Sequence, residues 1–276
     1  MWEKIKKREE KRLGRRWKGF CAILIVTVGV LAGCSGSKDS KGQEVTILIA
    51  AAASLKNVFE EQLIPMFEEQ NPKIRVEGTY DSSGKLQMQI EEGLEADVFL
   101  SAATKQMTAL TDKDIINSET VVNLLENKIV LIVPYGASET EMVVFEDIKN
   151  ADCIALGDPE SVPAGQYAKE SLSSLGLWEK IQPRVSFGTN VTEVLNQVAS
   201  ASADAGIVYA TDAYSMADQV TIVAEAPNGS LGQEILYPIG ILKRTEHSEE
   251  ANVFLEFLQS GEAMEVFESY GFAPGK

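Results

Sequence analysis

Between residues 44 and 272 the chain alternates short apolar runs with longer stretches whose apolar residues recur every three to four positions. Short continuous runs are typical of strands covered on both faces, and the wider spacing is typical of amphipathic helices. The predicted strands are 44–51, 73–80, 96–102, 128–134, 153–157, 204–210 and 236–243. The predicted helices begin near residues 54, 84, 163 and 190, and two more fill 249–272. This alternation predicts an α/β fold with mostly parallel strands.

Two strand-to-helix junctions carry serine hydroxyls. Ser54 follows the first predicted strand at the N-cap position, and Ser82 and Ser83 precede the helix that carries Leu86. In α/β folds, ligands bind at the carboxyl ends of strands, where helix N-termini also point. A helix start presents unpaired N–H groups and the positive end of its dipole, and both attract anions.

Two further junctions offer backbone donors instead. Pro163 suits the first turn of a helix and leaves the N–H of Ala164 free. Asn190 and Glu193 fit a capping box, which makes Val191 the first helical residue, with an unpaired N–H. None of the four junctions needs a cation at its tip. Ordinary helix capping gives the same pattern, so these residues alone leave an anion site and simple capping both open.

The first 33 residues differ from the rest in charge. They carry nine basic and three acidic side chains, and they end in the apolar run "CAILIVTVGVLAG", which is shorter than the roughly 20 residues that span a bilayer. A basic start, a short apolar run and small residues at its end predict an export signal over 1–33. The whole chain carries −16, so the part after this signal carries −22 and should repel nucleic acid.

The end of this signal, "LAGC", resembles the lipobox of bacterial lipoproteins. The resemblance implies cleavage before Cys34 and acylation of Cys34, followed by a flexible polar tether over 34–43. The alternative is a chance cysteine after a membrane anchor.

Residue counts argue against several kinds of chemistry. After Cys34 the chain has one cysteine, Cys153, and one histidine, His247, so no internal disulfide, no usual zinc site and no Ser-His-Asp or Cys-His pair is expected. The stretch from Gly78 to Gly84 looks like a phosphate loop, but five residues separate these glycines instead of four. Leu86 stands where that loop needs Ser or Thr. A phosphoryl-transfer enzyme is therefore disfavoured, and the chain is predicted not to be an enzyme.

Six segments resemble the molybdate-binding proteins of bacterial ABC importers, in the family's order and over about residues 44–272. They are "AAASL", "SSGKLQMQIEEG", "ADVFLSA", "GDPESVPAGQYAKESL", "DAGIVYATDA" and "ESYGF". The resemblance implies the two-lobed periplasmic-binding-protein fold of type II, with the ligand in the cleft between the lobes. The chain crossings predict lobe 1 over 44–127 and 238–276, and lobe 2 over 128–237.

The resemblance also implies the ligand contacts. Ser54 and Ser83 would donate hydroxyl and backbone hydrogen bonds, Ala164 and Val191 would donate backbone N–H, and Tyr209 would donate its phenol. Ser82 replaces Ser83 if the alignment shifts by one residue. Molybdenum would be bound as the oxyanion, with no metal coordinated directly by the protein and no cofactor.

The implied setting is the outer face of the cytoplasmic membrane, or the periplasmic side. There a monomeric lipoprotein, held to the membrane by its lipid alone, would deliver molybdate or tungstate to an ABC permease and its ATPase. Three alternatives stay open at this point. They are the same fold specific for tungstate, sulfate or phosphate, a phosphoryl-transfer enzyme, and a structural lipoprotein without a ligand.

Overall fold

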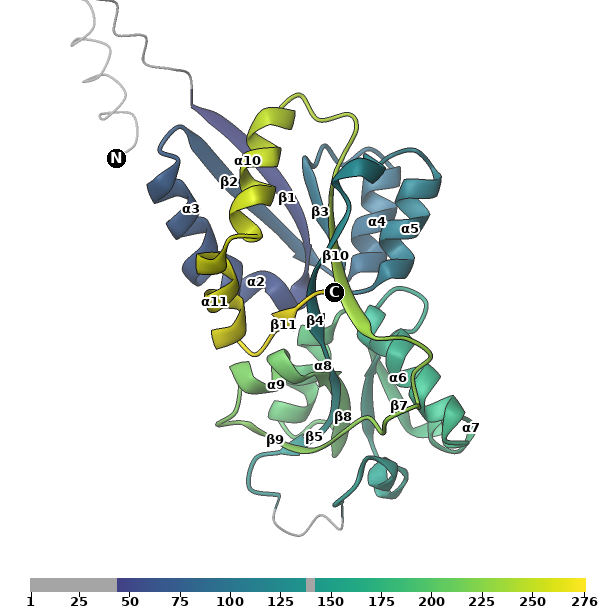
Figure 1. The fold of residues 1–276 in the computed structure, drawn as a ribbon. Coiled ribbons are helices and arrows are strands. Elements are labelled where there is room, and N and C mark those ends of the chain that lie inside the picture. Colours follow the sequence, from purple (N-terminus) through teal and green to yellow (C-terminus); the bar gives the residue numbers. More distant parts are fainter. Residues whose placement is uncertain (1–43, 138–141) are drawn as a thin grey trace, which may run out of the picture. The chain divides into compact units, whose positions relative to one another are not determined.

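The computed structural model describes residues 44–137 and 142–276, which belong to one compact unit (Figure 1). The predicted signal over 1–33, the lipidation site Cys34 and the tether over 34–43 lie outside the described residues. Across the described ranges, no helix has the length and apolar character needed to cross a membrane. Two sheets flanked by helices confirm the predicted α/β class.

The first sheet has six strands in the order β11-β4-β10-β3-β1-β2. Its members are β1 (Val45–Ala52), β2 (Ile74–Asp81), β3 (Val98–Leu100), β4 (Val122–Asn127), β10 (Ile235–Ile241) and β11 (Ala273–Pro274). The second sheet has five strands in the order β7-β6-β8-β5-β9. Its members are β5 (Ile129–Pro134), β6 (Ile154–Gly157), β7 (Val185–Gly188), β8 (Ala205–Tyr209) and β9 (Val220–Glu225).

Both sheets are mixed: most strands of each run in one direction, as expected, and β10, β11 and β5 run against them. β1 is parallel to β2 and β3, and β6 is parallel to β7 and β8. β10 is antiparallel to β3 and β4, and β5 is antiparallel to β8 and β9. The cause is the passage of the chain between the sheets. β10 returns from the second sheet and β5 arrives from the first. Each is therefore antiparallel to the strands beside it.

Helices cover the sheets. The α-helices are α2 (Lys56–Val58), α3 (Ile64–Gln70), α4 (Ser83–Glu91), α5 (Thr104–Asp112), α6 (Pro163–Ser174), α7 (Trp178–Ile181), α8 (Val191–Ala199), α9 (Ala210–Ser215), α10 (Ser248–Leu258) and α11 (Gly261–Ser269). Short 3₁₀ turns occur at η1 (Ala53–Leu55), η3 (Ser118–Thr120), η4 (Phe145–Asn150) and η5 (Gln182–Arg184). One π-helical turn, η2 (Phe59–Leu63), joins α2 to α3. Pro65 explains it, because Pro65 has no N–H for the carbonyl of Glu61 and the regular α ladder cannot continue there.

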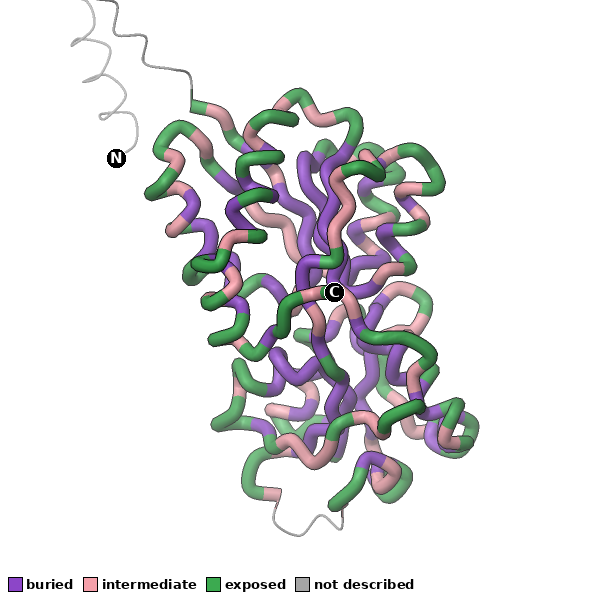
Figure 2. Tube along the Cα trace, in the orientation of Figure 1, coloured by how far each residue is buried: buried purple, intermediate pink, exposed green. Residues whose placement is uncertain are grey.

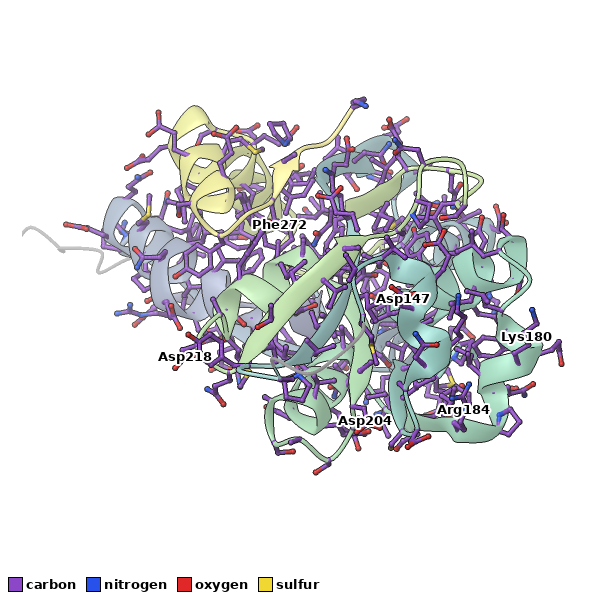
Figure 3. All side chains as sticks on the ribbon, turned by 90° about the horizontal axis from the view of Figure 1, so that it is seen from below. Asp147, Lys180, Arg184, Asp204, Asp218 and Phe272 are labelled. Atoms are coloured by element: carbon purple, nitrogen blue, oxygen red, sulfur yellow. The ribbon has the colours of Figure 1, made fainter. Side chains whose placement is uncertain are left out.

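Aromatic rings close the core on one face of the first sheet. Phe67 lies 4.9 Å from Phe254 between ring centroids, and Phe59 lies 6.0 Å from Phe267, so α10 and α11 pack on the helix that follows β1. Phe272, labelled in Figure 3, lies 5.5 Å from the ring of Tyr237 in β10. The strands form the buried interior and the helices carry the exposed positions (Figure 2).

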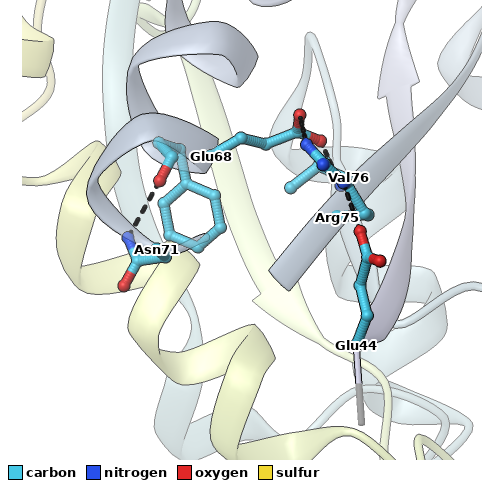
Figure 4. Close-up of polar contacts among 6 residues, drawn as sticks. Glu44, Glu68, Asn71, Arg75 and Val76 are labelled. Carbon is cyan, nitrogen blue, oxygen red and sulfur yellow. Dashed lines mark hydrogen bonds and ion pairs between the residues drawn. The ribbon is translucent and has the colours of Figure 1, made fainter. Parts of the chain in front are cut away.

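The first two strands are fixed by an ion-pair group at their start (Figure 4). Glu68 of α3 accepts from the backbone N–H of Val76 at 3.0 Å and from Arg75 Nη1 at 2.7 Å. Arg75 also pairs with Glu44, just before β1. These contacts tie α3 to β2 and to the point where the described chain begins, far from the carboxyl ends of the strands.

Candidate functional site

Ser54 lies at the carboxyl end of β1 as the second residue of η1, so the predicted N-cap position is wrong: the N-cap is Ala52. Its side chain is half-buried, and its Oγ lies 3.1 Å from Tyr237 Oη. Tyr237 is fully buried, and its Oη also accepts from Asn127 Nδ2 at 3.2 Å. The Ser54 hydroxyl therefore bonds a side chain of β10, which is itself bonded to a side chain of β4.

Ser83 is the first residue of α4 and is fully buried. Its Oγ accepts from the backbone N–H of Ala102 at 2.9 Å, which leaves the hydroxyl proton of Ser83 free to donate. Ser82 is the N-cap residue, yet its side chain makes no capping bond, and its buried Oγ has no partner among the described residues. Both serines therefore offer a proton at this helix start, and the choice of Ser83 over Ser82 stays a prediction.

Ala164 is the second residue of α6, which begins at Pro163 as predicted. Within the described ranges its N–H has no hydrogen-bond partner, and the N-cap residue makes no side-chain cap. The helix start rests directly on the end of β6, because a Cβ on Gly165 would lie 2.0 Å from the carbonyl oxygen of Gly157. Glycine at 165 therefore lets the Ala164 N–H stand at the carboxyl end of the strand.

Val191 is the first residue of α8, as predicted, and is 4% exposed. The N-cap residue Asn190 accepts from the N–H of Glu193 at 2.9 Å. Glu193 Oε2 in turn accepts from the N–H of Thr189 at 2.7 Å, so the predicted capping box is shifted by one residue on this side. No bond to the Val191 N–H exists in the described part of the chain, which matches the expected orphan donor.

Tyr209 is the last residue of β8 and is 1% exposed. Its hydroxyl donates to the carbonyl of Ala102 at 3.0 Å, and its ring lies 5.4 Å from that of Tyr237. Burial raises the pKa of Tyr209 well above its ordinary value, so the phenol keeps its proton. Its single proton points at Ala102 in this structure.

Contacts between the junctions bring these five residues into one region. Ala102, just after β3, bonds Ser83 through its N–H and Tyr209 through its carbonyl. The N–H of Gly84 in α4 donates to the carbonyl of Ser161, just before α6, at 3.0 Å. Asn190 Nδ2, at the start of α8, donates to Asp81 Oδ1 at the end of β2, at 3.3 Å. The helix starts of α4, α6 and α8 therefore meet beside the ends of β1, β3 and β8.

Two charged groups near these junctions, Lys85 and Asp212, have partners of their own. Lys85 Nζ pairs with Asp81 Oδ1 at 3.3 Å, and its side chain is 31% exposed, as expected for a surface residue of the first helical turn. Asp212 in α9 accepts from the N–H of Tyr209 at 3.3 Å, and burial raises the pKa of its carboxyl to about 7. The described residues hold no group of three or more His, Cys, Asp or Glu that suits a metal ion.

Sequence reasoning missed three residues of this region: Asn127, Tyr237 and Ala102. Asn127 and Tyr237 are polar groups inside or at the end of apolar strand runs, which is a weak signal of a buried polar contact. Ala102 acts through its backbone, so its side chain carries no signal.

The family description "bacterial extracellular solute-binding protein" matches residues 47–273. A putative ABC transporter substrate-binding lipoprotein of Bacillus subtilis is 43% identical over 94% of this chain and 98% of its own length. A molybdate-binding protein of Haemophilus influenzae is 36% identical over 90% of this chain and 97% of its own.

Solved structures agree with these relatives. The substrate-binding domain of a putative molybdenum ABC transporter from Clostridium difficile is 33% identical, with a TM-score of 0.65 over 84% of this chain and all of that one. The periplasmic molybdate-binding protein of Azotobacter vinelandii has a TM-score of 0.73 at 22% identity, over 83% of this chain and all of that one. At this identity the likeness supports the fold and nothing more.

Proposed function

This chain belongs to the family of bacterial extracellular solute-binding proteins, and from that premise we propose that it captures molybdate outside the cytoplasm and delivers it to an ABC importer. Tungstate, which has nearly the same size and shape, would bind at the same site. The named relatives are binding proteins, and we include in the proposal that this chain catalyses no reaction. The bound oxyanion is its cargo, and no cofactor takes part.

The proposal rests on one observation, the meeting of uncharged donors at helix starts. Ser54 and Ser83 offer hydroxyls, and Ala164 and Val191 offer backbone N–H groups free of other partners among the described residues. A dianion that leaves water loses the hydrogen bonds of its hydration shell, and donors of this kind replace them. Helix starts supply such donors without a cation that would itself need desolvation. Tyr209 joins them under one condition: its proton must leave the carbonyl of Ala102 to reach the anion.

The number of donors suits tight binding. A hydrogen bond to a charged group contributes roughly 1.5–3 kcal/mol. Several such bonds, less the costs of ordering and desolvation, correspond to a submicromolar dissociation constant.

Selectivity follows from the kind of donor. A backbone N–H group donates a hydrogen bond but cannot accept one. The proton of hydrogen phosphate would therefore find no acceptor among these groups. A cavity whose size is set by backbone positions disfavours the smaller sulfate. The same cavity discriminates little between molybdate and tungstate.

Lobe closure would bury the ligand and create the surface that the permease recognises. We place lobe 1 at 44–127 and 238–276, and lobe 2 at 128–237. The first crossing is then the step from β4 to β5 through Lys128, and the second lies within β10, between Tyr237 and Pro238, where its register with β4 shifts. The anion shifts the chain toward the closed state because it binds that state more tightly.

Membrane attachment belongs to the same proposal. Cys34 would carry the lipid that holds the protein at the outer face of the membrane, and stable anchoring needs more than one acyl chain. The protein would work as a monomer, with the permease and its ATPase as partners. Mass spectrometry of the membrane-bound protein tests the lipid, because an unmodified Cys34 would remove this part of the proposal.

Calorimetry tests the ligand. Molybdate, tungstate, sulfate, phosphate and ATP are titrated into the purified protein. We expect submicromolar binding of molybdate and tungstate, and binding at least about a hundredfold weaker for sulfate and phosphate. Heat with sulfate or phosphate alone would assign another oxyanion to the same site. Heat with ATP alone would favour a nucleotide-using enzyme, and no heat with any of them would favour a structural lipoprotein.

A further inference from the structure

We propose that Tyr237 is a positioning residue that, together with Asn127, turns the proton of the Ser54 hydroxyl toward the bound oxyanion. The inference rests on the proposed function, because it concerns how one donor of that site is oriented. It follows from counting donors and acceptors along a chain of hydrogen bonds that runs from Asn127 through Tyr237 to Ser54.

The Asn127 amide fixes the direction of this chain at its first member. Its Oδ1 accepts from the backbone N–H of Lys128 at 2.8 Å, so the other end of the amide must be the NH₂ group. The two protons of that group point at Thr211 Oγ1, at 3.0 Å, and at Tyr237 Oη, at 3.2 Å. Tyr237 Oη is therefore an acceptor toward Asn127.

Tyr237 has a single phenolic proton, and it needs its own acceptor. The residue is 0% exposed, so water does not supply one, and a buried hydroxyl without a partner is costly. Among the described residues, Ser54 Oγ, 3.1 Å away, is the acceptor within hydrogen-bond distance. Burial also raises the pKa of Tyr237 well above its ordinary value, so the proton is present at any physiological pH.

Ser54 then accepts from Tyr237 and has its own proton left to donate. Ser54 is half-buried at the end of β1, where its hydroxyl is free to turn away from Tyr237. A hydroxyl that already accepts a hydrogen bond is also a stronger donor, because successive bonds polarise one another. The phenol therefore does two things for Ser54: it removes the competing orientation of the proton, and it strengthens the remaining donor.

Asn127 and Tyr237 also lie on the two strands by which the chain passes between the sheets. Asn127 is the last residue of β4, immediately before the chain enters the second sheet, and Tyr237 lies in β10, by which it returns. Thr211, bonded to the same Asn127 amide, belongs to α9 beside the second sheet. The orientation of the Ser54 donor is thus built from both strands that connect the sheets.

The test is a double-mutant cycle between Tyr237 and Ser54, read as the dissociation constant for molybdate on the full chain in detergent. Tyr237→Phe removes only the hydroxyl. We expect it to weaken binding about fivefold in the wild-type background, and less than twofold when Ser54 is already alanine, because the phenol acts through Ser54. Thermal unfolding of each ligand-free variant checks that the fold is retained.

Tyr80→Phe is the matched control. The Tyr80 hydroxyl is also buried and has no hydrogen-bond partner among the described residues, but it belongs to β2 and lies outside the chain of hydrogen bonds from Asn127 to Ser54. We expect its removal to leave the dissociation constant unchanged. A loss equal to that of Tyr237→Phe would mean that any buried tyrosine hydroxyl matters, and would overturn the positioning role.

The failures of the two proposals are distinguishable. If the wild-type protein binds molybdate and Tyr237→Phe has the same effect with and without the Ser54 hydroxyl, the positioning role is wrong while the proposed function stands. An unchanged affinity in Tyr237→Phe has the same meaning. If the wild-type protein binds no oxyanion, both proposals fail together.

Discussion

Ser54 and Ser83 both lie where a strand gives way to a helical segment, yet they are supported in different ways. The oxygen of Ser83 accepts from a backbone N–H, that of Ala102. The oxygen of Ser54 lies against a side chain, Tyr237, which is itself bonded to Asn127. A backbone support is fixed by the course of the strand and survives most substitutions at its own position. A side-chain support is adjustable, but a single substitution removes it.

The comparison extends to how the two regions are closed. On the Ser83 side, α4 touches the loop before α6 through backbone atoms, those of Gly84 and Ser161. On the Ser54 side, a cavity of about 140 Å³ remains, lined by Ser54, Asp212 and Phe272 among others. One side is therefore set by tight backbone contact and the other by side chains around a small space.

The largest effect should come from breaking the backbone contact. A Cβ at residue 84 would lie 2.4 Å from the carbonyl oxygen of Ser161, which is backbone and cannot move aside. Gly84→Ala should hold α4 away from the start of α6 and withdraw two or more donors from the anion. At roughly 1.5–3 kcal/mol for each bond to the anion, we expect molybdate affinity to fall about a thousandfold in a calorimetric titration.

Gly261→Ala is the control for that experiment. Gly261 also lies in the first turn of a helix, α11, but a Cβ there would meet no atom within 4 Å. Its affinity should equal that of the wild type. If Gly84→Ala also binds normally, the contact between Gly84 and Ser161 is not needed for the bound state.

A second experiment uses the buried carboxyl on the Ser54 side. The pKa of Asp212 is about 7 in the folded chain, above its ordinary value of 3.8, because burial disfavours the charge. The folded state therefore binds this proton more tightly than the unfolded state. The stability that binding of this proton gives to the folded state is fully present below about pH 4 and is lost as the pH rises to about 7. Asp212→Asn removes the titration and keeps an oxygen that can accept from Tyr209.

We expect the unfolding free energy of the wild type, relative to Asp212→Asn, to fall by a few kcal/mol between about pH 4 and pH 7 and to stay level above that. Urea unfolding at several pH values measures it. Taking the difference between the two proteins cancels the opposite contributions of carboxylates such as Glu91 and Asp147, whose pKa values are lowered by their partners. A difference that does not change with pH would show that Asp212 does not titrate in this window.

The two serines themselves should differ in what their loss does to stability. Ser83→Ala and Ser54→Ala should each weaken molybdate binding about tenfold, the value of one hydrogen bond. Ser83→Ala also leaves the buried N–H of Ala102 without an acceptor, which costs about 1–3 kcal/mol of unfolding free energy. Ser54→Ala also takes the acceptor from the buried Tyr237 hydroxyl, but it should cost less, because water from the small cavity that borders Ser54 can take the place of the lost oxygen. Equal losses of stability in urea unfolding would contradict the difference between backbone and side-chain support.

The smallest effect is expected at Tyr209. Its proton is held by the carbonyl of Ala102, so the anion gains this donor only in exchange for an existing bond. Tyr209→Phe should therefore weaken molybdate binding by about threefold or less, clearly below the effect at either serine. A tenfold loss would show that Tyr209 leaves Ala102 and serves the anion fully in the bound state.

The junctions were predictable because their signals are local. Pro163 at the start of α6 and Asn190 at the start of α8 act within one helical turn, and the structure confirms both helix starts. The support of Ser54 was not predictable in this way. Ser54 and Tyr237 are separated by 183 positions in the chain, and no local pattern links them.

The elements of secondary structure also differ in whether the local sequence predicts them. The helix α5 was missed because its nine residues carry few apolar positions, with Met107 and Leu110 among its buried ones. The direction of β10 was missed because it depends on where the chain comes from, and an apolar run has no direction of its own.

The return of β10 to the first sheet also governs the order in which the protein can form. β10, α10 and α11 come from residues 235–276, yet β10 pairs with β3 and β4, and Phe254 and Phe267 pack against the ring of Phe59. A chain that emerges from its amino end therefore cannot complete its first sheet until almost all of it has appeared. Pairings between distant segments form slowly. A polypeptide built in this way keeps its first sheet incomplete during most of its synthesis, and an incomplete sheet favours export through a membrane before the chain folds.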